Sequence, residues 1–184
     1  MNVYDFDNTL LRGDSTARFV GYCFTRYPAV WSDFFGQAFN ALLFALKLRE
    51  KQAFKERLLS FLSKIDAEAA VEDFWRKNFC RIKPFYAEIQ RPDDVVISAS
   101  PEFLIRPACE RLGIRYIIGS PVDSRTGKFL GANCHGKEKV RRFYEVFPNG
   151  KIDCFYSDSH SDDPLAAIAK APFLVRGVKR LPWN

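Results

Sequence analysis

The stretch VYDFDNTL at residues 3–10 places two carboxylates, Asp5 and Asp7, directly after apolar residues. The segment NVYDF at residues 2–6 predicts a buried strand that ends where the carboxylates begin. Like charges this close repel each other, and carboxylates are rarely buried without partners. We therefore expect a cation or an anionic substrate beside Asp5 and Asp7, with a turn exposed to solvent as the alternative.

Helical patterns follow this strand. The expected helices span residues 15–27, 30–50, 51–65 and 67–82. Pro84 ends the last of them, and a connection of this length is too long for a simple crossover between neighbouring strands. We expect an inserted α-helical cap subdomain over residues 15–84, between core segments 1–14 and 85–184. The aromatic residues expected in the cap interior are Phe34, Phe35, Phe39 and Phe44.

Strands and helices alternate after residue 84. The expected strands span residues 94–100, 115–120, 152–159 and 172–177. The expected helices span residues 101–113, 137–147 and 163–171. This alternation is typical of a parallel sheet with helices on both faces. The sequence therefore predicts an α/β fold, a Rossmann-like three-layer sandwich around a mostly parallel sheet.

Polar clusters stand where several expected strands end, and open α/β sheets bind their ligands at that edge. The clusters are DFDNT (5–9), SAS (98–100), YSDSHSDD (156–163) and, at the start of a helix, GKEK (136–139). One carboxylate of such a set can attack phosphorus, and another can exchange protons with the leaving group. Hard oxygen ligands suit Mg²⁺. The clusters therefore indicate phosphoryl transfer with Mg²⁺ as cofactor.

The four clusters, in this order, resemble the motifs of the haloacid dehalogenase superfamily, in particular its phosphoserine-phosphatase-like branch with a helical cap after the first strand. The first motif, DxDx[TV], is matched by residues 5–9. Ser98 ends the next core strand, a lysine lies at a helix start in GKEKV, and Asp158 and Asp162 match an acidic pair spaced like GDxxxD. The resemblance spans essentially the whole chain and implies a phosphoric monoester hydrolase.

The resemblance also implies roles for individual carboxylates. Asp5 is similar to the nucleophile that forms an aspartyl-phosphate, and Asp7 to the general acid/base whose backbone carbonyl is a metal ligand. Asp158 resembles the metal-binding carboxylate, and Asp162 a residue that supports the metal site. Dehalogenases of the superfamily lack the second Asp of the first motif, so the presence of Asp7 points to phosphatase or phosphotransferase chemistry.

Two choices remain open for the phosphate-binding residues. Ser98 and Ser100 are hard to separate, since a serine at a strand end often only caps the next helix. Ser98 fits the family position better. Lys139 is favoured over Lys137, which we then expect at the surface. Asp14 lies where the chain enters the cap, and a substrate contact, a hinge or a helix cap would each suit it.

The sequence departs from the family pattern at two places. Asn8 stands where Gly is commoner, and Ser157 and Ser159 stand where phosphoserine phosphatases usually have Gly. Neither change removes a charge, so we expect the chemistry to be retained. The serine-rich variant nevertheless argues against phosphoserine as the substrate.

Composition narrows the range of partners. The net charge is +6, but the basic residues are scattered and do not interleave with aromatics, so we expect no nucleic-acid partner. The five cysteines lack any CxxC spacing, which argues against zinc or disulfides and favours a reducing, cytoplasmic setting. No basic region precedes an apolar run at the N-terminus, so we expect no signal peptide.

We therefore expect a cytoplasmic, Mg²⁺-dependent phosphatase that hydrolyses a small phosphorylated metabolite through an aspartyl-phosphate. The apolar segment 34–48 and its basic surroundings leave an alternative, in which the cap contacts a membrane surface and admits a lipid phosphate. The stretches CHGKEKV and YSDSHSDDPL also resemble phosphatidylglycerophosphate phosphatases. A non-catalytic binding protein is the third alternative, and the intact set of acidic residues argues against it.

Overall fold

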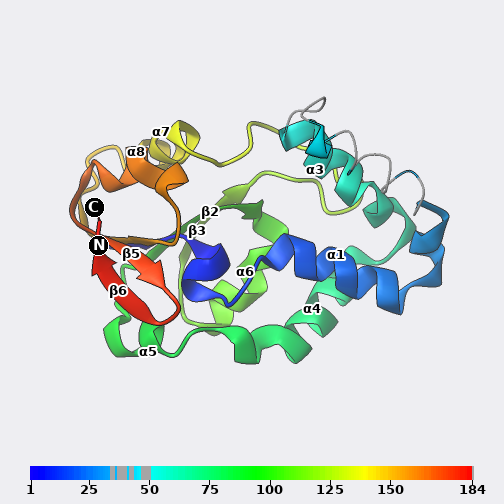
Figure 1. Ribbon diagram of the computed structural model, residues 1–184, viewed down its shortest axis with the longest axis horizontal. Helices are drawn as coiled ribbons and strands as arrows, with labels where there is room; N and C mark the ends of the chain where they lie inside the picture. Colours follow the sequence, from blue (N-terminus) through cyan, green and yellow to red (C-terminus); the bar gives the residue numbers. More distant parts are fainter. Residues whose placement is uncertain (34–35, 37–40, 42–43, 47–50, 184) are drawn as a thin grey trace.

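The computed structural model describes residues 1–33, 36, 41, 44–46 and 51–183 (Figure 1). A six-stranded sheet lies at its centre, with the strand order β3-β2-β1-β4-β5-β6. The strands are β1 (Asn2–Tyr4), β2 (Val95–Pro101), β3 (Tyr116–Ser120), β4 (Ile152–Ser157), β5 (Ala169–Arg176) and β6 (Lys179–Pro182). Neighbouring strands are parallel except for β5 and β6, so the expected mostly parallel sheet is confirmed.

Helices cover both faces of the sheet. Alternate strand residues point to opposite faces, and the two core clusters follow this alternation. Val3 and Val95 belong to a cluster with α7 and α8, whereas Tyr4 and Val96 belong to a second cluster with α5 and α6. The covering helices are α5 (Phe85–Ile89), α6 (Glu102–Arg111), α7 (Lys137–Val146) and α8 (Asp163–Ala166). The three-layer sandwich is therefore confirmed.

Most of the described residues between Asp14 and Ile82 lie in helices. The elements of this segment are α1 (Ser15–Arg26), the 3₁₀ segment η2 (Pro28–Asp33), α3 (Lys51–Leu59), the 3₁₀ segment η3 (Ser60–Lys64), α4 (Ala67–Asn78) and the 3₁₀ turn η4 (Phe79–Arg81). Figure 1 shows α1 extending away from the sheet, with α3 and α4 on either side of it. None of the helices described here is long and apolar enough to cross a membrane.

The helices of this segment are anchored to the sheet layers through α6. Phe19 and Trp75 are fully buried in the same cluster as Leu104 of α6, and the Trp75 Nε1–H donates to the Leu104 carbonyl at 2.6 Å. Burial of an aromatic side chain of this size contributes about 1.5–3 kcal/mol. The helical segment therefore shares its core with one sheet face, and the cap boundaries at residues 14/15 and 84/85 stay a prediction.

Part of the helical segment departs from the sequence pattern. The 3₁₀ segment η2 forms at the start of the helix expected over 30–50. The described residues 36, 41, 44 and 45 are helical, and much of the rest lies outside the described residues. Phe44 is described; it is 38% exposed and stacks on Phe54 with ring centroids 4.3 Å apart. The expectation of a core position is therefore wrong for Phe44. The other three aromatics, Phe34, Phe35 and Phe39, lie outside the described residues.

The last part of the chain is more extended than expected. The helix expected over 163–171 ends at Ala166, because Ala169 and Ala171 pair with Ile152 and Cys154 of β4 and so belong to β5. A two-residue turn with Gly177 at φ 63° then leads into β6, a strand that the sequence pattern did not predict. All four residues of β6 are exposed, and the strand forms one end of the sheet.

Candidate active site

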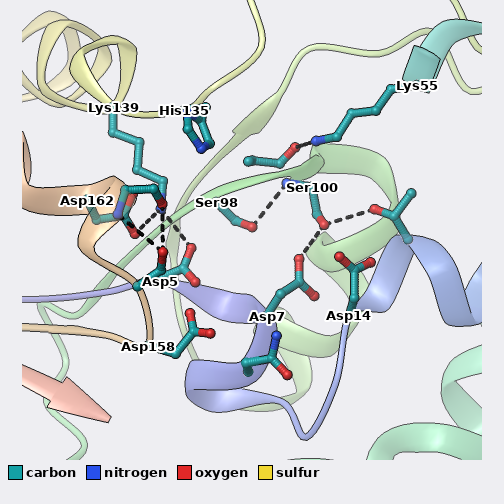
Figure 2. Close-up of a pocket in the computed structure, with 15 residues that line it drawn as sticks. Asp5, Asp7, Asp14, Lys55, Ser98, Ser100, His135, Lys139, Asp158 and Asp162 are labelled. Carbon is teal, nitrogen blue, oxygen red and sulfur yellow. Dashed lines mark hydrogen bonds and ion pairs between the residues drawn. The ribbon is translucent and has the colours of Figure 1, made fainter. Parts of the chain in front are cut away.

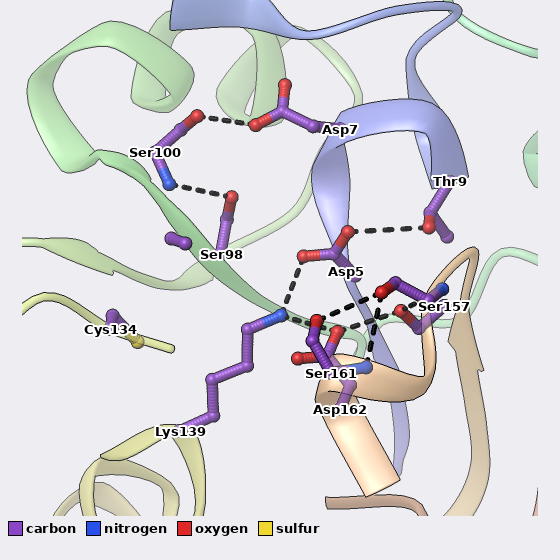
Figure 3. A network of polar contacts seen from close by, with 12 residues as sticks. Asp5, Asp7, Thr9, Ser98, Ser100, Cys134, Lys139, Ser157, Ser161 and Asp162 are labelled. Carbon is purple, nitrogen blue, oxygen red and sulfur yellow. Dashed lines mark hydrogen bonds and ion pairs between the residues drawn. The ribbon is translucent and has the colours of Figure 1, made fainter. Parts of the chain in front are cut away.

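Asp5 lies directly after β1, which runs between β2 and β4 in the middle of the sheet. Its backbone N–H donates to the Tyr156 carbonyl at 2.8 Å and continues the ladder toward β4. The side chain is 8% exposed, and its Oδ1 accepts from Lys139 Nζ at 2.7 Å (Figure 3). Its Oδ2 accepts from Thr9 Oγ1 at 3.4 Å. The sheet therefore holds this carboxylate in a fixed direction at its carboxyl edge, which is the edge formed by the ends of its parallel strands.

A wide turn, η1 (Phe6–Leu10), follows Asp5 and directs the next carboxylate to the same edge. The turn is closed by the Leu11 N–H, which donates to the Phe6 carbonyl at 2.9 Å. Asn8 sits in it with φ 55°, a left-handed conformation that Gly and Asn tolerate best. This conformation explains why Asn can replace the commoner Gly. Lys83, which is 4% exposed, holds the turn by donating to the Asn8 carbonyl.

Asp7 is held at both carboxylate oxygens. Its Oδ1 accepts from the Ser15 backbone N–H at 2.6 Å. Its Oδ2 accepts from Ser100 Oγ (Figures 2 and 3). Burial raises the pKa of Asp7 to about 6, and the charge of Asp14 adds to the rise, while the bonds from Ser100 and Ser15 oppose it. A carboxyl group with a pKa close to neutrality can both give and take a proton.

The two candidate lysines lie in different environments. Lys139 is 2% exposed, and its Nζ lies 2.7 Å from Asp5 Oδ1 and 2.7 Å from Asp162 Oδ2. Burial works against the charge of Lys139, but the Asp5 and Asp162 carboxylates outweigh it and raise the pKa. Lys137 is exposed at the start of α7. The preference for Lys139 at the site therefore agrees with the geometry.

Asp162 and Asp158 follow β4 and complete the acidic part of the site. Asp162 is 2% exposed, and its Oδ2 also accepts from Ser157 Oγ at 2.7 Å. Asp158 lines the same pocket, and burial raises its pKa, with Asp162 adding to the rise. Burial also raises the pKa of Asp5 to about 7, against the charge of Lys139. Burial and mutual repulsion therefore disfavour the ionised form of Asp5 and Asp158 in this pocket.

The two serines at the end of β2 have separate partners. Ser98 Oγ accepts from the Ser100 backbone N–H at 3.1 Å, and among the described residues no oxygen accepts its proton. The Ser100 hydroxyl instead donates to Asp7. Ser100 does not cap helix α6, because Pro101 is the N-cap residue and makes no side-chain cap bond. The capping alternative therefore does not apply to Ser100, and Ser98 is the serine with a proton to offer a ligand; its role as the phosphate-binding serine stays a prediction.

These side chains line one pocket of about 270 Å³ (Figure 2). The predicted site residues that line it are Asp5, Asp7, Ser98, Lys139, Asp158 and Asp162. Lys55 enters from α3 and donates to the Ala99 carbonyl at 2.7 Å and to Asn133 Oδ1 at 3.1 Å. Asp14 caps helix α1 by accepting from the Ala17 N–H at 2.8 Å, and it lines the pocket as well. Sequence reasoning missed Lys55, whose position among scattered basic residues carries no motif.

The donor chemistry of the pocket fits a hard divalent cation. No group of three or more His, Cys, Asp or Glu side chains within the described part of the chain is arranged to hold a metal by itself. Mg²⁺ typically takes only one or two carboxylates from a protein and keeps several waters. Asp5 and Asp158 supply two carboxylates, and Asp162 Oδ1 is buried without a hydrogen-bond partner. A cation in the pocket would offset this concentration of negative charge.

Comparison with known proteins shows the family to which this chain belongs. The family of haloacid dehalogenase-like hydrolases matches residues 3–167. A histidinol-phosphatase of Neisseria meningitidis is 26% identical over 203 residues, which cover 94% of this chain and 88% of the relative. The protein CicA of Caulobacter vibrioides is 37% identical over 81 residues, which cover 41% of this chain and 36% of CicA. This chain therefore matches only about a third of the length of CicA.

Solved structures share the fold. A Bordetella pertussis protein of unknown function has a TM-score of 0.78 at 19% identity, and the match covers 95% of this chain and 88% of that protein. A phosphoserine phosphatase with an analogue of its phospho-aspartyl intermediate has a TM-score of 0.54 at 15% identity, covering 94% of this chain and 84% of that one. At these identities the two matches show that the chain has the same fold as the two solved proteins.

Proposed function

The chain belongs to the haloacid dehalogenase-like hydrolases, and from this premise we propose that it is a Mg²⁺-dependent phosphatase of a small organic phosphomonoester. The observation that supports this best is the buried contact of Asp5 with Lys139, beside Asp7 at the carboxyl edge. It combines a carboxylate nucleophile, a fixed positive charge and a proton carrier in one pocket. These are the parts that phosphoryl transfer through an aspartyl-phosphate needs.

In the first step, an Asp5 carboxylate oxygen attacks phosphorus, and the bond from phosphorus to the leaving oxygen breaks. Asp7 gives its proton to that leaving oxygen, so that a neutral alcohol departs. Lys139 keeps Asp5 oriented and offsets negative charge on the phosphoryl oxygens, and Ser98 donates its hydroxyl proton to one of them. The product of this step is an aspartyl-phosphate, a mixed anhydride of the Asp5 carboxylate and phosphate.

In the second step, a water attacks the phosphorus of this aspartyl-phosphate on the side that the alcohol has left. Asp7, now ionised, takes a proton from the water as the new bond forms. The bond between phosphorus and the Asp5 oxygen breaks, which returns Asp5 to its carboxylate form and releases inorganic phosphate. Asp7 thus acts as acid and then as base, and a pKa of about 6 suits both tasks.

Asp5 and Asp158, with the backbone carbonyl of Asp7, would hold Mg²⁺, and Asp162 would support that site. When bound, the ion supplies positive charge to the phosphoryl oxygens and relieves the repulsion between the carboxylates.

A panel of phosphomonoesters with Mg²⁺ tests the proposed function. L-Histidinol phosphate heads the panel because the Neisseria relative covers 94% of this chain, and phosphoserine, glycerol phosphate and a lipid phosphate in vesicles complete it. We expect release of inorganic phosphate from at least one soluble ester, and loss of that activity on chelation of the metal. Preference for the lipid phosphate would instead favour the membrane-surface alternative.

Asp5→Asn should abolish turnover, because the amide cannot act as the nucleophile. We expect a loss of at least about a thousandfold in kcat. Asp93→Asn is the control, since Asp93 is an exposed carboxylate outside the pocket, and it should keep wild-type activity. Acid quenching during turnover, followed by mass spectrometry, should find a phosphorylated Asp5 in the wild type only. Substantial activity in Asp5→Asn would refute the nucleophile assignment.

A further inference from the structure

The hydroxyl of Ser100 has three polar neighbours. It donates to Asp7 Oδ2, lies 3.0 Å from Ser15 Oγ and lies 2.9 Å from Thr16 Oγ1. The three hydroxyl-bearing residues are buried, with exposed fractions between 0% and 5%. They come from two segments more than 80 residues apart, the end of β2 and the first turn of α1. The Ser100 hydroxyl therefore joins β2, α1 and Asp7 through hydrogen bonds.

The direction of each hydrogen bond in the group follows from the donors available. A serine hydroxyl has one proton and two lone pairs. The single Ser100 proton goes to Asp7 Oδ2, which has a lone pair for this bond in both the ionised and the protonated form of the carboxyl group. Ser15 Oγ donates to Ser100 Oγ, and Thr16 must then donate as well, because Ser100 has no second proton. Both lone pairs of Ser100 are therefore used, and its proton has one direction left.

The Ser15 backbone N–H completes the arrangement on the other carboxylate oxygen. It donates to Asp7 Oδ1 at 2.6 Å, so Asp7 is held on one side by α1 and on the other by β2. A carboxylate held at both oxygens cannot rotate about its terminal bond without breaking one of these contacts. The side chain of the proposed proton carrier is thus fixed relative to Asp5 before substrate enters.

We propose that Ser100 is a positioning residue, which holds the Asp7 carboxyl at the angle from which it protonates the leaving oxygen. The inference rests on the proposed phosphatase function and deepens it. Ser100 need not touch the substrate, because its hydroxyl is engaged with Asp7, Ser15 and Thr16. Of the two tasks of Asp7, the transfer of its proton to the leaving oxygen is the one that kcat/KM reports, since the later attack of water does not enter that constant.

The test compares two substrates with different needs for that proton. An alkyl phosphate requires protonation of its leaving oxygen, whereas p-nitrophenyl phosphate releases a stable phenolate without it. We expect Ser100→Ala to lower kcat/KM about ten- to hundredfold on the alkyl phosphate. The loss on p-nitrophenyl phosphate should be at most about threefold. Ser100→Thr keeps the hydroxyl and should retain most of the wild-type kcat/KM on the alkyl phosphate.

A double-mutant cycle separates positioning from a general effect on the fold. In an Asp7→Asn background there is no acid to orient, so adding Ser100→Ala should change kcat/KM by less than about twofold. Ser15→Ala is the matched control. It removes a buried hydroxyl that contacts Ser100 rather than Asp7, and it keeps the backbone N–H that donates to Asp7. It should lose less on the alkyl phosphate than Ser100→Ala does.

Equal losses on the two substrates, or the same loss in the Asp7→Asn background, would overturn the inference while leaving the proposed function intact. Should Ser100→Ala fail to fold by circular dichroism, Ser100→Cys, which is close in size and a weaker donor, carries the same comparison. A wild-type protein that hydrolyses neither substrate with Mg²⁺ would overturn the proposed function itself, and the positioning role with it.

Discussion

The carboxyl edge of the sheet and the helical segment between β1 and β2 contribute to the pocket in different ways. At the carboxyl edge, buried side chains from distant parts of the sequence bind one another directly, as Lys139 binds Asp5 and Asp162. The helical segment reaches the pocket through Lys55 of α3 and the first turn of α1. The carboxyl edge therefore carries the proposed chemistry, and the helical segment supplies contacts around it.

Of the substitutions that separate the two regions, Lys139→Met should cause the largest loss of activity and stability. It removes the charge that two buried carboxylates share, and loss of one such electrostatic partner costs about a hundred- to thousandfold in kcat. The uncompensated carboxylates should also lower the free energy of unfolding by about 3–5 kcal/mol. Turnover assays and urea denaturation measure the two effects.

Lys137→Met is the matched control, two residues earlier and exposed on the same helix. It should change the free energy of unfolding by no more than about 0.5 kcal/mol. If the two substitutions cost the same activity, the distinction between the buried and the exposed lysine has no functional content.

Ser157→Ala should have an intermediate effect at the same edge. Its hydroxyl donates to Asp162 Oδ2, and a hydrogen bond to a charged group contributes about 1.5–3 kcal/mol. We expect a drop of this size in the free energy of unfolding and a loss of about tenfold in kcat, because Asp162 also holds Lys139. An unchanged denaturation midpoint would show that Ser157 does not stabilise Asp162.

Lys55→Met should have the smallest effect and should act on binding. Lys55 lines the pocket from the helical segment, away from the Asp5–Lys139 contact. We expect KM to rise about three- to fivefold with kcat nearly unchanged, which is the pattern for an interaction made equally in the ground and transition states. Lys64→Met, on an exposed lysine that contacts Ser32, is the control and should alter neither constant. A fall in kcat would instead place Lys55 in the chemical step.

The side chains that meet at the carboxyl edge were predictable because their positions follow from the topology of the sheet. Once strands are parallel, polar residues that follow them meet at one edge, and this brought Asp5, Ser98 and Asp158 together from the sequence alone. The choice of Lys139 over Lys137 also agrees with the geometry, since residues two apart on a helix point in different directions.

The partners of Asp7 were not predictable in this way. The contact of Ser100 with Ser15 and Thr16 depends on where the first turn of α1 packs against β2, and no sequence periodicity encodes that position. Lys55 was missed for the same reason. The strand β6 did leave a signal, because Gly177 and Val178 form a two-residue connection flanked by residues that pair across it.

The strand β6 also has a consequence for how the molecule behaves in concentrated solution. The outer strand of a sheet offers unpaired backbone groups to any other extended chain, and such strands template aggregation unless they are short, charged or interrupted by proline. β6 has four residues, including Lys179, Arg180 and Pro182, and they are exposed. The short, charged and proline-containing strand β6 thus disfavours edge-to-edge pairing with another strand.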